Sequence, residues 1–540
     1  MPNSVSTLAV FQNRTFRMLW IATLASNFGG LVQSVGAAWM MTTLTSSQSM
    51  VALVQSSVTL PIMIFSLAAG VFADNFDRRK IMLWAQGFMC LVSLALAFLA
   101  YEALLTPWLL LGFTFLLGCG TALHNPSWQA SVGDIVTRDE LSAAVSVNSM
   151  GFNMMRSVGP AAGGAIVALA GAAAAFAVNA LSYVAIIAAL VGWHPALTPR
   201  RLPREPFGSA FAAGLRYVAL SPNLTRIILR GFVFGLSAVV VQALLPLVVR
   251  DRLAGDAFVY GALLGAFGLG AVGGALANNK LRARLRNEII TRFGFLGFAV
   301  TCLVLGFSTH LLLSAVSLLL AGFCWVISLS LFNVTMQLST PRWVVGRVLA
   351  LYQTGVFGGM AAGSWLWGAL AQSAGLNTAL GIASIVLLVG VAIGFVAPLP
   401  DSEDLNLDPL NRFTEPPLQL DITPRSGPIM VMVDYQIDQT DVPQFLDLMS
   451  QRRRVRVRDG AQQWALLRDL ENPDQWTESY HVPTWVEYIR HHERRTQADA
   501  AVFDQLRQLH RGPGPLRVHR MIERQTVTAQ DDIPRRMKPD

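Results

Sequence analysis

Charged side chains inside long apolar stretches are the residues of this chain best suited to do chemistry. Arg156 stands about halfway along one such stretch, where a charge costs at least ~2.5–3.5 kcal/mol in a bilayer. A guanidinium at that depth normally faces a water-filled cavity or a partner, and no Asp or Glu lies at comparable depth in the sequence. Arg156 therefore either binds an anionic or strongly polar substrate, or bonds to amide side chains and fixes helix packing.

A second group of polar side chains lies in other apolar stretches. His124 and Asn125 precede Pro126, a proline that frees a backbone carbonyl and allows a bend. His124 titrates near neutrality and is a candidate proton carrier, the alternative being a hydrogen-bonded packing role. Amide side chains inside a membrane are favoured toward a cavity, although some simply join helices. With Arg156 and His124, the predicted substrate-binding residues are Asn27, Gln33, Asn125, Asn153, Asn333 and Gln353.

Composition indicates what must hold these residues in place. Of the 540 residues, 53% are hydrophobic and 14% are charged. From about residue 16 to 396, apolar runs of roughly 20 residues follow one another, the length that crosses a hydrocarbon core. After Pro398 the chain becomes ordinary in charge. The fold class is therefore an all-α polytopic membrane protein with a soluble tail, and the bilayer is its first partner.

We predict twelve membrane-spanning helices. The loops after every second span carry the basic residues, Arg78, Arg138 and Arg342 among them. Positive loops stay in the cytoplasm, so both termini are expected there, with the protein in a bacterial inner membrane; nucleic acid is not an expected partner. The spans are 16–45, 50–76, 79–101, 107–136, 140–170, 172–193, 223–249, 257–279, 288–308, 311–339, 343–372 and 377–397.

A long-range repeat indicates two related halves. The stretch that begins at Gly70 has a degenerate copy that begins at Gly274, and the same spacing separates Arg138 from Arg342. One spacing shared by several positions is typical of a duplicated bundle, so two pseudo-symmetric six-helix bundles are expected.

The remaining segments complete the predicted domain organisation. In the link between the halves, Phe207, Phe211, Leu215 and Val218 recur at helical spacing and suggest an amphipathic helix on the membrane surface, the alternative being a plain linker. The tail reads strand-helix-strand-strand-helix-strand, the order of a ferredoxin-like α+β domain. The predicted parts are 1–193 and 223–398 (bundles), 194–222 and 399–427 (linkers), 428–525 (ferredoxin-like domain) and 526–540 (disordered).

Several kinds of chemistry find no support. The four cysteines lie inside apolar runs without a metal-binding spacing, so they are expected to pack as small apolar residues. No P-loop occurs, which argues against ATP hydrolysis. We therefore expect no metal, no cofactor and no enzymatic activity.

The loop from Gly70 to Arg79 carries the pattern G-x-x-x-D-x-x-x-R-R. It resembles the signature loop of the major facilitator superfamily of transporters, although Asp77 stands where the family usually has glycine. The resemblance implies a cytoplasmic latch between the halves made by Gly70, Asp74, Arg78 and Arg79, with Asp134 as a neighbour. The alternative is that these charges only set topology.

A glycine-rich motif follows Arg156. Gly159, Pro160, Gly163 and Gly164 form a sequence similar to the G-P-x-x-G-G motif of drug and metabolite exporters in the superfamily. The match is partial, because Met155 replaces an earlier family glycine. Glycines at this spacing permit close backbone approach, and a general small-residue packing stripe is the alternative.

The finer pattern resembles the branch that contains the enterobactin exporter. It is carried by the residues from Asp74 to Arg79, from His124 to Pro126 and from Arg138 to Gly164. The resemblance implies export of a small metabolite, siderophore or drug by alternating access, powered by H⁺. Import is left open, and so is a membrane-anchored enzyme or sensor that acts through the tail.

The tail is similar to the domain of antibiotic-biosynthesis monooxygenases. The similarity is carried by Trp464–Asp469, Trp485–Arg494 and His510–Pro513. Those enzymes use no metal or flavin, and their domains usually pair. The resemblance implies a homodimer through the tail, and we expect dimerisation or regulation of the transporter rather than catalysis.

Overall fold

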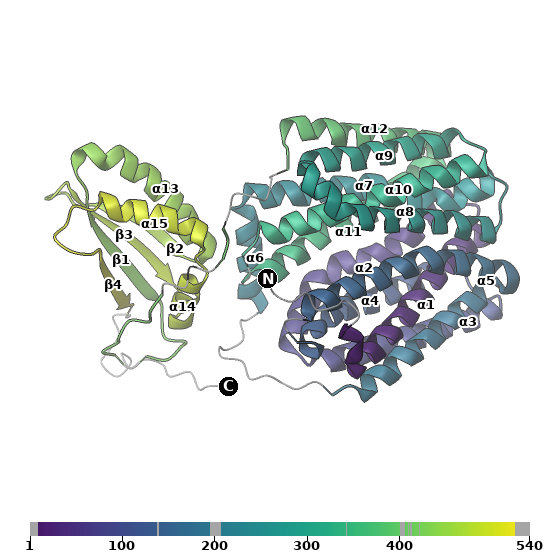
Figure 1. Ribbon diagram of the computed structural model, residues 1–540, viewed down its shortest axis with the longest axis horizontal. Helices are drawn as coiled ribbons and strands as arrows, with labels where there is room; N and C mark the ends of the chain where they lie inside the picture. The colour runs from purple at the N-terminus through teal and green to yellow at the C-terminus, as the bar shows by residue number, and fades with distance from the viewer. Residues whose placement is uncertain are drawn as a thin grey trace. The chain divides into compact units, whose positions relative to one another are not determined.

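The computed structural model describes residues 9–137, 140–194, 207–341, 343–399, 406–408, 410, 413–420 and 422–523. The chain folds into two compact units. The first unit comprises Met1–Phe207, Thr225–Met336 and Leu349–Asp401, and the second comprises Gly208–Leu224, Gln337–Val348 and Ser402–Asp540. Figure 1 shows long helices in the first unit and a small sheet with helices in the second.

The first unit is entirely helical in its described part. Side-chain caps set several helix starts: Asn13 Oδ1 accepts the Phe16 N–H, and Asp256 accepts the Val259 N–H, which satisfies otherwise orphaned donors. After a short 3-10 turn at Ala9–Gln12, the helices are α1 (Arg14–Leu44), α2 (Gln48–Asn75), α3 (Arg78–Tyr101), α4 (Pro107–Ile135), α5 (Leu141–Gly192), α7 (Pro222–Asp251), α8 (Ala257–Arg284), α9 (Asn287–Phe307), α10 (Leu311–Leu338), α11 (Val345–Ala374) and α12 (Leu376–Val396).

Ten helices in the described residues are long and apolar enough to cross a membrane. The difference from twelve has two sources. The predicted spans 140–170 and 172–193 join as the single helix α5, and the predicted span 343–372 forms α11, which is outside these ten. Within α5, Gly171 has a φ of +78°, a left-handed conformation that glycine adopts without a Cβ penalty. The predicted boundary therefore corresponds to a kink.

One face of α3 carries large apolar side chains that are exposed on the surface of the first unit. Trp84, Leu91 and Phe98 are 80%, 70% and 61% exposed. They recur every seven residues, so they share one face of the helix. An exposed apolar stripe of this size marks a surface meant for an apolar partner, which is consistent with contact with lipid.

The second unit contains an antiparallel sheet of order β2-β3-β1-β4. Alternate residues of β1, including Val431 and Val433, enter a core with Phe445 and Tyr480, as expected for a sheet with one buried face. The elements are β1 (Ile429–Gln436), β2 (Gln462–Arg468), β3 (Gln475–Val482), β4 (Arg517–Ile522), α6 (Phe207–Ala219), α13 (Val442–Asp459), α14 (Trp485–Glu493), α15 (Gln497–Leu509) and a 3-10 turn at Gln439–Asp441.

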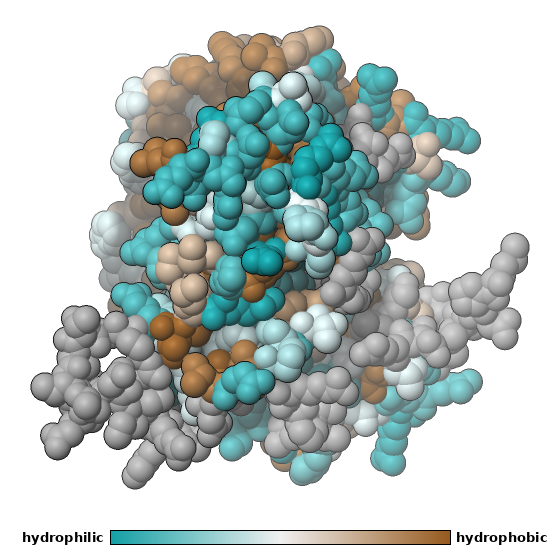
Figure 2. All heavy atoms as spheres, turned by 90° about the vertical axis from the view of Figure 1, so that its left-hand side faces the viewer, coloured by the Kyte–Doolittle hydropathy of each residue, from teal (hydrophilic) through white to brown (hydrophobic). Residues whose placement is uncertain are grey.

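The apolar side chains predicted to share one face of α6 differ in burial. Phe211 and Leu215 are exposed, whereas Val218 is buried together with Ala213 and Tyr217. Ala213 and Tyr217 lie two residues after Phe211 and Leu215, respectively, so the helix buries the side roughly opposite these two predicted residues. In Figure 2, much of the described surface turned toward the viewer is hydrophilic, in contrast to the stripe on α3.

Some predicted features lie outside the described residues. They are the side chains of Gly70, Asp74 and Phe207, all of Arg138 and Arg342, the linker residues 195–206 and the terminal segment 526–540.

Candidate functional site

The two halves of the first unit meet through glycines of α5 and α8. A Cβ built on Gly164 would lie 2.7 Å from the Cα of Gly261, and one on Gly268 would lie 2.5 Å from the Cα of Ser157. Real Cβ atoms do not approach so closely, so the two backbones are in direct contact. A Cβ on Gly261 would also lie 2.6 Å from the carbonyl oxygen of Pro160. The motif after Arg156 thus lies on the seam between the halves.

The other two motif glycines face α1 within the N-terminal half. A Cβ on Gly159 would lie 2.8 Å from the Cβ of Leu31, and one on Gly163 would lie 3.0 Å from the Cα of Val32. The motif therefore allows α5 to approach α1 and α8 together, as small residues do between membrane helices.

Substituting one seam glycine tests this contact. Gly268→Ala is expected to destabilise the protein by about 1–3 kcal/mol, the usual cost of overpacking. The control is Gly112→Ala, because a Cβ there would meet no atom within 4 Å. In thermal unfolding in detergent, the Tm of Gly268→Ala should be lower than that of the wild type, and the Tm of Gly112→Ala should not be lowered. Equal Tm values in the two variants would contradict the close contact.

A second seam joins α2 to α11 through hydroxyl groups. Ser56 Oγ donates a hydrogen bond of 2.8 Å to the carbonyl oxygen of Ala361, and the Ser66 and Thr354 hydroxyls are 2.8 Å apart. Near the start of α2, Ser49 Oγ donates to the Gly368 carbonyl at 3.1 Å. These hydrogen bonds are spread along much of the length of α2. Each joins a hydroxyl group of α2 to a backbone carbonyl or a hydroxyl group of α11.

Arg156 lies beside the first seam. Its guanidinium carbon is 5.4 Å from the ring centroid of Phe267 in α8 and 5.7 Å from that of Trp325 in α10. Both rings belong to the other half, and such positions give a cation–π attraction. Arg156 is half-buried, and among the described residues its guanidinium makes no hydrogen bond or ion pair. Its donors are therefore available to a ligand.

Two other predicted binding residues already have buried partners. Gln33 Oε1 accepts a 2.8 Å hydrogen bond from Ser93 and another from the amide of Asn179. His124 Nδ1 is 3.2 Å from Gln86 Nε2, and both side chains are buried. These bonds join helices inside the N-terminal half, which is the alternative that the sequence left open for them.

The remaining candidates differ in their surroundings. Asn153 Nδ2 donates to the carbonyl of Ser149 in its own helix at 2.9 Å. Asn125 is exposed, while the side chains of Asn27, Asn333 and Gln353 are half-buried. Within the described part of the chain, no hydrogen bond joins these side chains to Arg156, so their binding role stays a prediction.

The basic residues of the predicted latch contact the N-terminal half. Arg78 Nη1 lies 2.7 Å from Asp134 Oδ2, and both side chains are partly exposed. Arg79 donates to the carbonyl oxygens of Leu190 and Val191 at 2.8 and 2.7 Å. Asp77 Oδ1 accepts the Arg79 N–H at 3.0 Å and caps α3, which gives a reason for aspartate at that position. The latch function stays a prediction.

A buried charge cluster in the C-terminal half was missed from the sequence. Arg230 Nη2 is 2.6 Å from Glu288 Oε1, and Arg292 Nε is 3.1 Å from the same oxygen. Glu288 also accepts the Leu399 N–H at 2.9 Å. A signal existed in the sequence, since Arg230 stands well inside the seventh apolar run and Glu288 opens the ninth.

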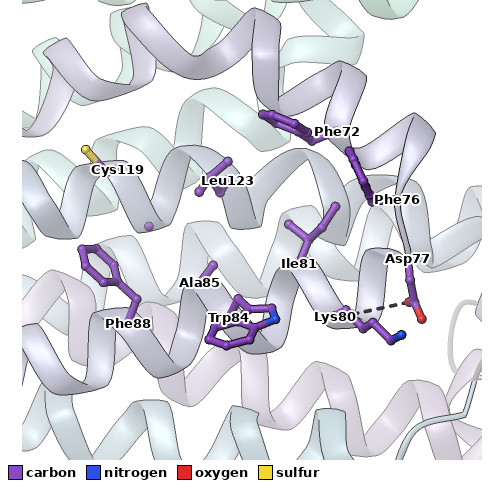
Figure 3. Close-up of a pocket in the computed structure, with 11 residues that line it drawn as sticks. Phe72, Phe76, Asp77, Lys80, Ile81, Trp84, Ala85, Phe88, Cys119 and Leu123 are labelled. Atoms are coloured by element: carbon purple, nitrogen blue, oxygen red, sulfur yellow. Dashed lines mark hydrogen bonds between the residues drawn. The ribbon is translucent and has the colours of Figure 1, made fainter. Parts of the chain in front are cut away.

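An apolar groove lies between α2, α3 and α4. Its volume is about 760 Å³, and Figure 3 shows Phe72, Trp84 and Phe88 along it, with Asp77 and Lys80 at one end. All three helices belong to the N-terminal half, and the groove includes Trp84 from the exposed stripe of α3. It is therefore a hollow of the N-terminal half rather than a cavity between the halves.

The part of the chain that the structure describes contains no cluster of side chains suited to bind a metal ion. No group of three or more His, Cys, Asp or Glu side chains could hold a metal ion there. The four cysteines are free, and Cys302 and Cys324 are buried.

Comparison with known proteins identifies the family. The model of the transmembrane secretion effector family, within the major facilitator superfamily, matches residues 5–527. The enterobactin exporter EntS of Escherichia coli O1:K1 is 28% identical over 357 residues, covering 66% of this chain and 82% of the exporter. EntS of Escherichia coli O127:H6 matches to the same extent.

Solved transporters share the fold. A bacterial homologue of the human lysosomal transporter Spinster, inward-facing and unoccupied, has a TM-score of 0.58 at 14% identity, covering 72% of this chain and 97% of that one. The POT family transporter PepTSo has a TM-score of 0.60 at 12% identity, covering 71% of this chain and 97% of that one. With the family match over nearly the whole length, the chain belongs to the transmembrane secretion effector family of membrane transporters.

Proposed function

We propose that this transporter exports a small, anionic or strongly polar metabolite by alternating access between its two halves. The observation that carries the proposal is Arg156, a half-buried guanidinium that has no hydrogen-bond partner among the described residues and lies over rings of the opposite half. A charge inside the membrane is retained when it has a functional partner.

The seams between the halves support alternating access. The close contact of α5 with α8 involves α8 as far as Gly268, whereas Gly270 and Gly274 pack against Leu319 and Phe323 of α10. The halves are thus joined over part of α8, and its remainder belongs to its own bundle. Rocking of one bundle against the other needs small residues or exchangeable hydroxyl bonds at the joints; the α5–α8 seam has the glycines, and the α2–α11 seam has the hydroxyl bonds.

The finer architecture belongs to the same proposal. Counting α5 as two spans and adding α11 gives twelve spans in two six-helix bundles. The basic loops favour cytoplasmic termini in a bacterial inner membrane. The sheet order of the C-terminal domain is compatible with a ferredoxin-like, monooxygenase-related domain that pairs with a second copy and has no enzymatic activity. Coupling to H⁺ completes the proposed mechanism.

The export direction and substrate class are proposed from EntS, a relative named as an enterobactin exporter. The test compares metabolites inside cells and in the medium, by mass spectrometry, with and without the gene. A polar metabolite should accumulate inside and disappear from the medium when the protein is absent, and the wild-type gene should restore it. Unchanged profiles would contradict the proposal, and depletion inside the cell would indicate import instead.

A further inference from the structure

The second unit brings together three segments that are far apart in the sequence. Besides the C-terminal domain, it contains residues 208–224 and 337–348. By connectivity, the first of these carries α6 and links the two halves of the transporter, and the second leads from α10 into α11. The C-terminal domain thus shares one compact unit with two connecting segments of the transporter.

An aromatic pair is the centre of this contact. Tyr217 of α6 and Trp343 have ring centroids 5.7 Å apart at an interplanar angle of 88°, the edge-to-face geometry that aromatic pairs favour. Tyr217 is 3% exposed, although α6 is a short helix in a linker. Burial of this kind requires a partner from outside the helix.

The C-terminal domain supplies that partner with two arginines. The guanidinium carbon of Arg458 lies 5.2 Å from the ring centroid of Tyr217, and that of Arg494 lies 4.6 Å from the ring of Trp343. Arg216 Nε of α6 also donates to the carbonyl oxygen of Arg458 at 3.4 Å. A cation over a ring is attracted by the negative face of the ring, most strongly where water is excluded.

Acidic residues of the domain hold both arginines in position. Arg458 lies 3.0 Å from Asp459 and 2.8 Å from Asp499. Arg494 donates to the Asp459 carbonyl at 2.8 Å. Because these bonds lie within the domain, the two guanidinium groups are pre-organised for the rings and lose little freedom on contact.

A glycine makes room at the same place. Gly460 follows α13 with a φ of +121°, and a Cβ there would lie 3.1 Å from Arg494 Nη1 and 3.4 Å from Arg216 Nη2. On the transporter side, a Cβ on Gly214 would lie 2.9 Å from the Cβ of Arg347, so α6 also packs closely on the start of α11. Close fit on both sides is what an interaction surface needs.

We infer that the C-terminal domain is a clamp, made by Arg458, Gly460 and Arg494, that binds α6 to the segment before α11. The clamp ties the link between the halves to one half of the transporter. Because alternating access moves the halves relative to each other, the clamp restrains that movement. This role goes beyond transport itself. Its test by export rate rests on the proposed function, whereas its test by distance measurement does not.

The first test measures the clamp without any substrate. Spin labels at Leu215→Cys in α6 and Gln451→Cys in α13 are placed in the full chain, with the four native cysteines replaced by alanine, in lipid nanodiscs. The distance distribution should be narrow in this background and broad when Tyr217→Leu and Trp343→Leu are added. Leucine keeps apolar volume but removes the ring faces, and Phe211→Ala on the exposed side of α6 is the control. An equally narrow distribution in the double variant would overturn the clamp.

The second test measures the restraint. At equal protein levels, cells with the Tyr217→Leu and Trp343→Leu variant should export the transported metabolite faster than wild type, by about twofold or more. Unchanged or slower export, with a broadened distance distribution, would overturn the restraint. If wild-type cells exported nothing, the proposed function would fail, and the distances would still decide whether the clamp exists.

Discussion

The Glu478→Gln variant is expected to lose the folded C-terminal domain. Glu478 is fully buried in β3, and its oxygens lie 2.7 Å from Arg452 Nε and 3.1 Å from Arg456 Nε. Trp464 Nε1 donates to it at 3.0 Å. Glutamine leaves two buried guanidinium groups without a counter-charge, a change that costs about 3–5 kcal/mol. That is a large share of the stability of a small domain.

Hydrogen exchange of the β1 and β3 amides in the full chain measures this loss. Protection should fall by a factor of about 100 or more, given about 1.4 kcal/mol per factor of ten. Glu471→Gln is the matched control, because Glu471 is exposed in the loop between β2 and β3. Full protection in Glu478→Gln would contradict the assigned role of the carboxylate.

Because of the Glu478 carboxylate, the stability of the C-terminal domain should depend on pH. Burial alone would raise the pKa of Glu478, but Arg452 and Arg456 outweigh it and, with the Trp464 hydrogen bond, lower the pKa from 4.5 to about 2. A lowered pKa stabilises the fold above the ordinary value, and that stabilisation disappears as the pH falls from about 4.5 to 2. The difference in protection between wild type and Glu478→Gln should therefore shrink over this range, and a constant difference would contradict the ion pairing.

The Glu288→Gln variant is expected to destabilise the membrane-spanning unit. Glu288 faces both Arg230 and Arg292, and the Arg230 side chain is 4% exposed. Without the carboxylate, a buried cation loses its counter-charge at a cost of about 3 kcal/mol or more. For a unit of this size, thermal unfolding in detergent should show a Tm lower by about 4 °C or more.

A double variant separates charge from packing in this cluster. Arg230→Met with Glu288→Met removes both members of the pair and keeps much of their volume, so its Tm should lie above that of Glu288→Gln. A double variant that is less stable than Glu288→Gln would show that packing or the hydrogen bond to Leu399, rather than the uncompensated charge, dominates.

Local patterns predicted the elements well. The apolar runs placed α1 and α3 within a few residues, and the boundary expected near residue 171 coincides with Gly171 and its positive φ. The strands β1 and β3 follow the strand-helix-strand-strand order expected of the tail, because alternation and flanking breakers are local signals. The second helix that the sequence predicts in the tail is divided into α14 and α15, since Thr496 and Asp499 form a capping box that starts a new helix.

Contacts between distant residues could not be predicted in this way. Gln33 bonds to Asn179 at a separation of 146 residues, and periodicity gives no sign of that pairing. Helix α6 is a similar case: spacing selected Phe211 and Leu215, whereas the structure buries Tyr217 under Arg458, which lies far along the chain. The cost of an intramembrane charge did single out Arg156, but the two rings beside it depend on how the halves meet.

The export rate of Arg156 variants tests the proposed binding site most directly. The assay uses the metabolite identified by its loss from the medium, everted membrane vesicles and equal amounts of inserted protein. We expect at least about a tenfold loss in Arg156→Ala, equivalent to about 1.4 kcal/mol or more of substrate binding, with partial activity in Arg156→Lys and wild-type activity in the exposed control Arg286→Ala. Wild-type rates in both Arg156 variants would contradict it.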